Sequence, residues 1–171
     1  MKFSFWVQLD AWARNMTPFG LTLIMVIISM VPVHVPGYAR VAPLLSLMAV
    51  YHWTVFRPEL LPALAVFVIG LLQDILSGMP IGVHALVFLI VYGLVLSQRR
   101  FLVGKSFAVV WLGFSVVATG AALLSWILIS AYNVTLVDPQ PVFFQYLMTL
   151  GTFPLLGLLL LRWQNAILEQ K

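Results

Sequence analysis

Long runs of apolar residues alternate with short breaks along most of the chain. The breaks contain Pro, Gly, Arg or Asn, residues that end or interrupt apolar helices. A helix of about 20 mostly apolar residues can cross the hydrocarbon core of a bilayer. The pattern therefore predicts an all-α membrane protein with six spans, at about residues 18–35, 41–56, 60–76, 81–97, 106–132 and 142–161.

The predicted spans differ in length. The second and third are short, so we expect them either to thin the bilayer or to be shielded by the other helices, with a re-entrant hairpin as the alternative. The fifth is longer than needed, which predicts that it is tilted, or broken near Gly113 or Gly120. Pro32 and Pro154 lie inside predicted spans, where proline kinks a helix.

Residues 1–17 form a different kind of segment. Their apolar side chains follow helical spacing on one side, with Trp6 and Trp12 among them. We expect a cytoplasmic helix lying on the membrane surface, with a frayed tail as the alternative. Because the segment carries charges and no continuous apolar core, it does not resemble a cleavable signal peptide.

Composition supports a membrane protein. Of 171 residues, 63% are hydrophobic and 8% are charged, whereas soluble domains average about 25% charged residues. The chain has no cysteine, which excludes disulfides and thiolate chemistry. No linker or repeat divides the sequence, so residues 1–171 are predicted to form a single domain.

The positive charges predict an orientation. With six spans, both termini lie on one side, and positive residues gather on the cytoplasmic side. A cytoplasmic N-terminus places eight of the nine Lys and Arg residues inside and only Arg40 outside. The inside residues are Lys2, Arg14, Arg57, Arg99, Arg100, Lys105, Arg162 and Lys171. This bias supports six spans and cytoplasmic termini.

The residues that could form a functional site are concentrated between positions 67 and 84. Asp74 is the only acid within a hydrophobic run, and a carboxylate at the centre of a membrane helix costs about 2.5–3.5 kcal/mol. One interpretation is a buried site in which Asp74 meets Gln73, His84 or a partner chain. The other is a cap, in which Asp74 accepts N–H groups from the following turn or from the start of the fourth span. We favour a structural or partner-organising role over catalysis.

Small residues surround Asp74. Gly78, Pro80 and Gly82 predict a tight turn and a helix start, although the glycine spacing also permits close helix contact. Gly70 lies one turn before Asp74 and would let another helix approach. A second set of small residues, predicted to pack inside the protein, comprises Ala118, Ala121, Ala122 and Ser125.

The histidines suggest a site only weakly. His34, His84 and Asp74 fall near the outer face and could form a metal site, but their spacing matches no known ligand pattern, so we expect no metal and no cofactor. His52 is predicted to make a polar contact between helices. The sequence contains no GxSxG, HExxH or phosphate-loop motif, and no span carries paired acids, so we do not expect an enzyme.

The stretch from Phe67 to His84 resembles the MreD family of bacterial rod shape-determining membrane proteins. The resemblance is carried by Phe67, Gly70–Asp74, Gly78, Pro80–Gly82 and His84: a hydrophobic helix ends in a Gly-Leu and Asp element, a short glycine turn follows, and the next helix begins with glycine. The length, the predicted orientation and a short second span ending in an aromatic cluster before Arg57 also fit that family.

The resemblance implies a multi-pass protein of the bacterial inner membrane that is similar in fold to the substrate-binding components of energy-coupling-factor transporters. It implies a non-enzymatic scaffold of the cell-elongation complex that binds MreC, a single-span protein, and helps to control cell shape and lateral peptidoglycan synthesis. Indirect partners would be MreB, RodA and a penicillin-binding transpeptidase, with membrane lipid around the helices and no nucleic acid.

On this interpretation, the partner-binding or groove-shaping residues are Gly70, Gln73, Asp74, Gly78, Pro80, Gly82 and His84. Asp74, Gly78 and Gly82 would shape the periplasmic end of a groove that receives a partner helix. The main alternative is a transporter component that binds a vitamin-type molecule near the outer face, through Asp74, His84 and aromatic residues. A third hypothesis is an enzyme acting on lipid.

Overall fold

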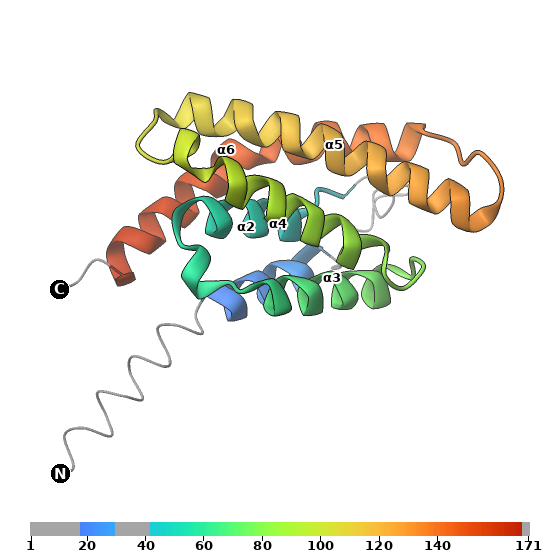
Figure 1. Ribbon diagram of the computed structural model, residues 1–171, viewed down its shortest axis with the longest axis horizontal. Coiled ribbons are helices and arrows are strands. Elements are labelled where there is room, and N and C mark those ends of the chain that lie inside the picture. The colour runs from blue at the N-terminus through green and yellow to red at the C-terminus, as the bar shows by residue number, and fades with distance from the viewer. Residues whose placement is uncertain (1–17, 30–41, 169–171) are drawn as a thin grey trace, which may run out of the picture.

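The computed structural model describes residues 18–29 and 42–168. Within these ranges the chain consists of helices and loops alone, which confirms the predicted all-α class. Figure 1 shows the arrangement of the helices. They are Pro18–Ser29, α2 (Leu45–Phe56), the short 3-10 helix η2 (Pro58–Leu60), α3 (Ala63–Ser77), α4 (Val83–Leu102), α5 (Phe107–Asn133) and α6 (Gln140–Leu168).

Three of the described helices, α4, α5 and α6, are long and apolar enough to cross a membrane. The helices Pro18–Ser29, α2 and α3 are apolar but shorter than the roughly 20 residues that a span needs. The short second and third elements therefore agree with the sequence. The predictions for the surface helix at residues 1–17, for the kink at Pro32 and for Arg40 concern residues outside the described ranges.

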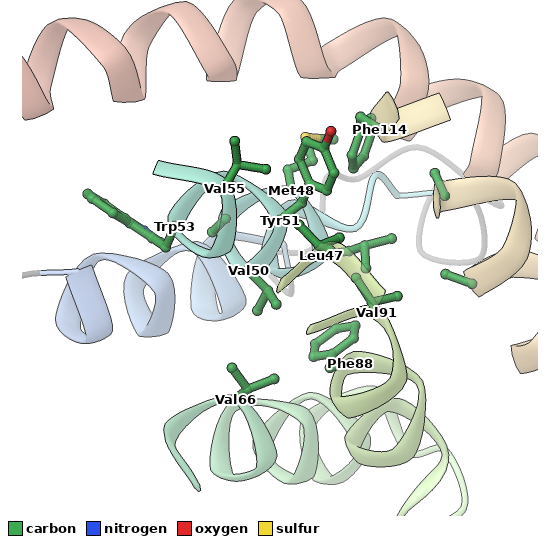
Figure 2. Packing of buried hydrophobic residues seen from close by; sticks show 14 of the residues in the cluster. Leu47, Met48, Val50, Tyr51, Trp53, Val55, Val66, Phe88, Val91 and Phe114 are labelled. Carbon is green, nitrogen blue, oxygen red and sulfur yellow. The ribbon is translucent and has the colours of Figure 1, made fainter. Parts of the chain in front are cut away.

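Helix α2 lies at the centre of the bundle (Figure 1). It has 12 residues, which makes it roughly 18 Å long. Every residue from Ser46 to Val55 is buried, because α2 is apolar on all sides and packs against α3, α4, α5 and α6. In Figure 2, Val66 of α3, Phe88 of α4 and Phe114 of α5 lie around it. Of the two explanations for a short second span, the structure favours shielding by neighbouring helices.

Helices α3 and α4 form an antiparallel hairpin joined by residues 78–82. The two helices are in contact along their length. α3 buries Val66, Ile69 and Gly70 toward its neighbours, and its other face exposes large apolar side chains such as Leu64 and Ile75. The hairpin thus has one face in the core and one face that is available to lipid or to another protein.

Helices α5 and α6 form a second antiparallel pair (Figure 1). α5 runs without interruption through Gly113 and Gly120, so the predicted alternative of a break at either glycine is wrong. Gly113 instead lies against α2, where a Cβ atom would be 2.8 Å from the Tyr51 hydroxyl. Helix α6 continues through Pro154.

The helix ends gather at two ends of the bundle. The α3–α4 turn and the α5–α6 connection lie at one end, which we call the outer end (Figure 1). The C-terminal ends of α2, α4 and α6 and the start of α5 lie at the other, the inner end. The described Lys and Arg residues lie at or near the inner helix ends. The orientation of the bundle in a membrane remains a prediction.

Candidate functional site

The carboxylate of Asp74 is fully buried in the last turn of α3 and faces the first turn of α4. Its Oδ2 atom accepts the Gly82 N–H at 2.9 Å and, more weakly, the Ala85 N–H at 3.4 Å. Its Oδ1 atom accepts the His84 N–H at 2.9 Å. The first N–H groups of a helix have no partner within that helix and carry a partial positive charge. Asp74 therefore caps α4 from the neighbouring helix.

The His84 ring completes the arrangement. Its Nδ1 atom lies 2.7 Å from Asp74 Oδ1, and the residue is only 5% exposed. The ring also makes an edge-on contact with Phe88, one turn further along α4. Asp74 is thus bonded both to the backbone and to a side chain of α4, so one carboxylate fixes the end of α3, the start of α4 and the orientation of an imidazole.

Gly70 explains how the two helices come close enough for this contact. A Cβ atom at Gly70 would lie 2.4 Å from the Cα atom and 2.7 Å from the backbone nitrogen of Ala85. These are backbone atoms, which cannot rotate away. Only glycine allows this approach. Asp74 lies one turn after Gly70 in α3, so the same close contact brings it within hydrogen-bonding distance of the first turn of α4.

The turn between the helices uses two glycines in the left-handed region. Gly78 has φ = 65° and ends α3, while Gly82 has φ = 105° and precedes α4. The Met79 N–H donates to the Asp74 carbonyl at 3.1 Å, and the Val83 N–H donates to the Pro80 carbonyl at 3.3 Å. A residue with a Cβ atom would be strained at either glycine. Both glycines are thus explained by the turn itself.

Gln73 connects the hairpin to the central helix. It is 2% exposed, and its Oε1 atom accepts a hydrogen bond from the Ser46 hydroxyl at 2.9 Å. Ser46 lies in the first turn of α2. Gln73 and Asp74 therefore point to different neighbours, one to α2 and the other to α4.

A small pocket lies beside His84 at the outer end of the bundle. It is lined by residues of α2, the α3–α4 turn, α4, α5 and α6, and it encloses about 40 Å³. The polar residues of its wall are His84, Ser125, Gln145, Tyr146 and Thr149. Thr149 and Gln145 make hydrogen bonds to Leu44 N–H and the Ala42 carbonyl, respectively, which hold α6 against the start of α2.

The structure brings together most of the residues predicted from the sequence. Asp74, Gly82 and His84 meet directly, and Gly70, Gly78 and Pro80 shape the surrounding helix contact and turn. Both predicted contacts of Asp74 are present: it caps the start of the fourth predicted span, and in its buried position it meets His84. His34 lies outside the described residues. His52 is buried in α2, with ring contacts to Trp53 and Phe56 of the same helix.

One residue with a comparable role was not singled out from the sequence. Arg99, in the last turns of α4, donates from Nε to the Val55 carbonyl at 2.8 Å and from Nη2 to the Phe56 carbonyl at 3.4 Å. These are the terminal carbonyls of α2, where a positive charge is favourable. From the sequence, Arg99 was predicted only to lie on the cytoplasmic side. Nothing in the sequence indicates that α4 passes the end of α2.

The comparisons with known proteins decide the family. A family model described as "rod shape-determining protein MreD" matches residues 13–163, which is most of the chain. The chain belongs to the MreD family. Rod shape determination is thus the process to which it is assigned, and the match includes the whole α3–α4 hairpin. No curated protein and no solved structure gives a significant match, so the expected likeness to transporter components remains a prediction.

Proposed function

We propose that this chain is a non-enzymatic scaffold of six membrane helices in the bacterial inner membrane, where it binds MreC and supports lateral wall synthesis. Membership of the MreD family is the observation that carries the proposal. RodA, MreB and a penicillin-binding transpeptidase would then be indirect partners. The three long apolar helices and the three shorter ones are consistent with a multi-pass protein.

The α3–α4 hairpin is the element that we propose for partner binding. Asp74 and Gly70 fix how α3 packs against α4. The exposed face of the hairpin, which points away from the core, therefore has a defined shape. Ile81 in the turn is 74% exposed, and Leu64, Ile75 and Leu76 on α3 are each at least half exposed. A rigid hairpin with an apolar surface suits a partner that is itself a membrane helix or the segment next to one.

The pocket at the outer end favours this proposal over a vitamin-binding component. Sites for small organic ligands usually enclose about 300–1,000 Å³. The pocket beside His84 encloses about 40 Å³, which is enough for a few atoms and not for a vitamin. Asp74 is also fully buried and committed to α4, which leaves it unable to contact a ligand directly.

The test is deletion of the gene in the native host, followed by measurement of cell width and of the incorporation of a fluorescent D-amino acid along the side wall. We expect rounded cells with little side-wall labelling, and recovery of both when the gene is supplied on a plasmid. Normal rods with normal side-wall labelling in the deletion strain would refute the proposed function.

A further inference from the structure

Helix α6 contains a proline within the part of the helix that packs against α5. Pro154 has no backbone N–H, so the carbonyl of Leu150, four residues earlier, loses its usual helical partner. The proline ring also pushes against that carbonyl. In a membrane helix, a backbone group freed by proline is usually satisfied by a neighbouring helix. Leu150 is therefore the residue of α6 at which a donor from another helix matters most.

Trp111 of α5 supplies this donor. Its indole Nε1 lies 3.3 Å from the carbonyl oxygen of Leu150. An indole N–H can only donate a hydrogen bond, and a carbonyl can only accept one, so the two groups match. Trp126, also on α5, donates at 2.9 Å to the Val137 carbonyl in the α5–α6 connection. Trp111 thus joins α5 to α6 at the point where the hydrogen bonding of α6 is interrupted.

The proline divides α6 into two halves that are held in different ways. The outer half, residues 140–153, is tied to the start of α2 by directional polar contacts. The Thr149 hydroxyl accepts the Leu44 N–H at 3.0 Å, and the Gln145 side chain donates to the Ala42 carbonyl at 3.0 Å. These bonds fix both the position and the direction of the outer half.

The inner half, residues 154–168, is held by apolar contacts. A Cβ atom at Gly157 would lie 3.2 Å from the Phe107 ring, and the rings of Trp163 and Trp53 meet edge to face with centroids 6.3 Å apart. Among residues 155–163, no side chain makes a hydrogen bond to another described helix. In Figure 1, the end of α6 turns away from α5. Because apolar contacts are not directional, they restrict the direction of the inner half less than polar contacts would.

We propose that Pro154 is a hinge in α6 and that the hydrogen bond from Trp111 to Leu150 holds this hinge at one angle. When the bond breaks, the Leu150 carbonyl has no donor in α6 to replace it, and the inner half can change direction about the proline while the outer half stays on α2. The hinge is a conformational property of the chain, and it does not depend on which partner the α3–α4 hairpin binds.

The test measures distances between spin labels by pulsed electron paramagnetic resonance, with the full chain in lipid nanodiscs. The chain has no native cysteine, so labels attach only to introduced ones. The pair Leu94→Cys and Leu159→Cys reports on the inner half relative to α4. The pair Leu94→Cys and Phe144→Cys reports on the outer half. All three positions are at least half exposed.

Three substitutions are then compared in both labelled pairs. Trp111→Phe keeps an apolar ring and removes the N–H donor. Pro154→Ala, added to Trp111→Phe, restores a backbone N–H that can bond to the Leu150 carbonyl. Trp126→Phe is the control, because it removes the other indole donor of α5, which bonds to the α5–α6 connection instead of to α6.

We expect Trp111→Phe to broaden the distance distribution of the inner pair by about 2 Å or more and to leave that of the outer pair unchanged. Addition of Pro154→Ala should restore the narrow distribution, and Trp126→Phe should leave both pairs as in the wild type. An unchanged inner pair in Trp111→Phe, equal broadening of both pairs, or broadening that persists after addition of Pro154→Ala would overturn the proposal.

Discussion

Asp74 shows how a single carboxylate can be kept inside an apolar bundle. Placing an acid within a membrane helix costs about 2.5–3.5 kcal/mol, and hydrogen bonds to a charged group contribute about 1.5–3 kcal/mol each. Asp74 has two backbone N–H donors at 2.9 Å and the His84 ring at 2.7 Å. These bonds together offset the cost of burial, so the residue stabilises the hairpin it belongs to.

Replacement of Asp74 by alanine should therefore destabilise the protein strongly. We expect Asp74→Ala to lower the free energy of unfolding by roughly 3–5 kcal/mol, because it leaves the N-terminus of α4 uncapped and the His84 ring without its partner. The measurement is reversible unfolding in detergent. The control is Asp138→Ala, in the exposed α5–α6 connection, where the carboxylate caps α6 and its loss should cost about 1 kcal/mol. Equal effects of the two substitutions would contradict the role assigned to Asp74.

Gly70 allows a test of the close contact between α3 and α4. Gly70→Ala would place a methyl group 2.4 Å from the Ala85 Cα atom, and we expect a loss of about 1–3 kcal/mol or more as the helices separate. Gly93→Ala on α4 is the matched control, since a Cβ atom there meets nothing within 4 Å. Alanine favours a helix over glycine by up to about 1 kcal/mol, so Gly93→Ala should be neutral or stabilising. A neutral Gly70→Ala would show that the helices are not in this contact.

Among the helices, α4 takes part in a capping interaction at each end of the bundle. At the outer end its first N–H groups are capped by Asp74 of α3, and near the inner end its Arg99 caps the last carbonyls of α2. Helix α2 is short and buried on every side, so its terminal carbonyls cannot rely on water. The Arg99 side chain supplies their partner and a favourable charge at the negative end of α2.

Arg99 and its neighbour Arg100 provide a controlled comparison. Replacement of either arginine by alanine removes one positive charge from the inner end. Arg99 donates hydrogen bonds to α2. Arg100 is exposed, and among the described residues its side chain makes no hydrogen bond. We expect Arg99→Ala to cost about 1.5–3 kcal/mol and to speed amide hydrogen exchange in the last turn of α2. Arg100→Ala should leave both nearly unchanged. The same exchange pattern in the two variants would mean that Arg99 does not cap α2.

Much of the architecture follows from local patterns in the sequence. Apolar runs and the residues that interrupt them locate the helices, and Asp74, the glycines and Pro80 locate the turn, because these features act within a few residues. The role of Arg99, and the choice of shielding over bilayer thinning for α2, could not be predicted in the same way. Both depend on which helices lie side by side, and the apolar pattern of a membrane helix is much the same whether it faces lipid or protein.

For the whole molecule, the predicted orientation can be measured because the chain contains no cysteine. Single cysteines at Ile81 and Leu136, which are 74% and 84% exposed at the outer end, should react with a membrane-impermeant maleimide in spheroplasts. Cysteines at Gln98 and Lys105 of the inner end should react only after permeabilisation. Labelling of either pair from the opposite side would contradict the six-span arrangement with cytoplasmic termini.

The α3–α4 hairpin is the surface through which we propose that the chain binds MreC. The most direct measurement is the amount of MreC that co-purifies with the tagged protein from solubilised native membranes, for the wild type and two surface variants. Ile81→Asn alters the hairpin turn, and Leu136→Asn alters an equally exposed residue of the α5–α6 connection at the same end. We predict that Ile81→Asn reduces MreC recovery severalfold while Leu136→Asn retains it at equal protein levels. Full recovery with Ile81→Asn, or no MreC with the wild type, would contradict binding of MreC through the hairpin.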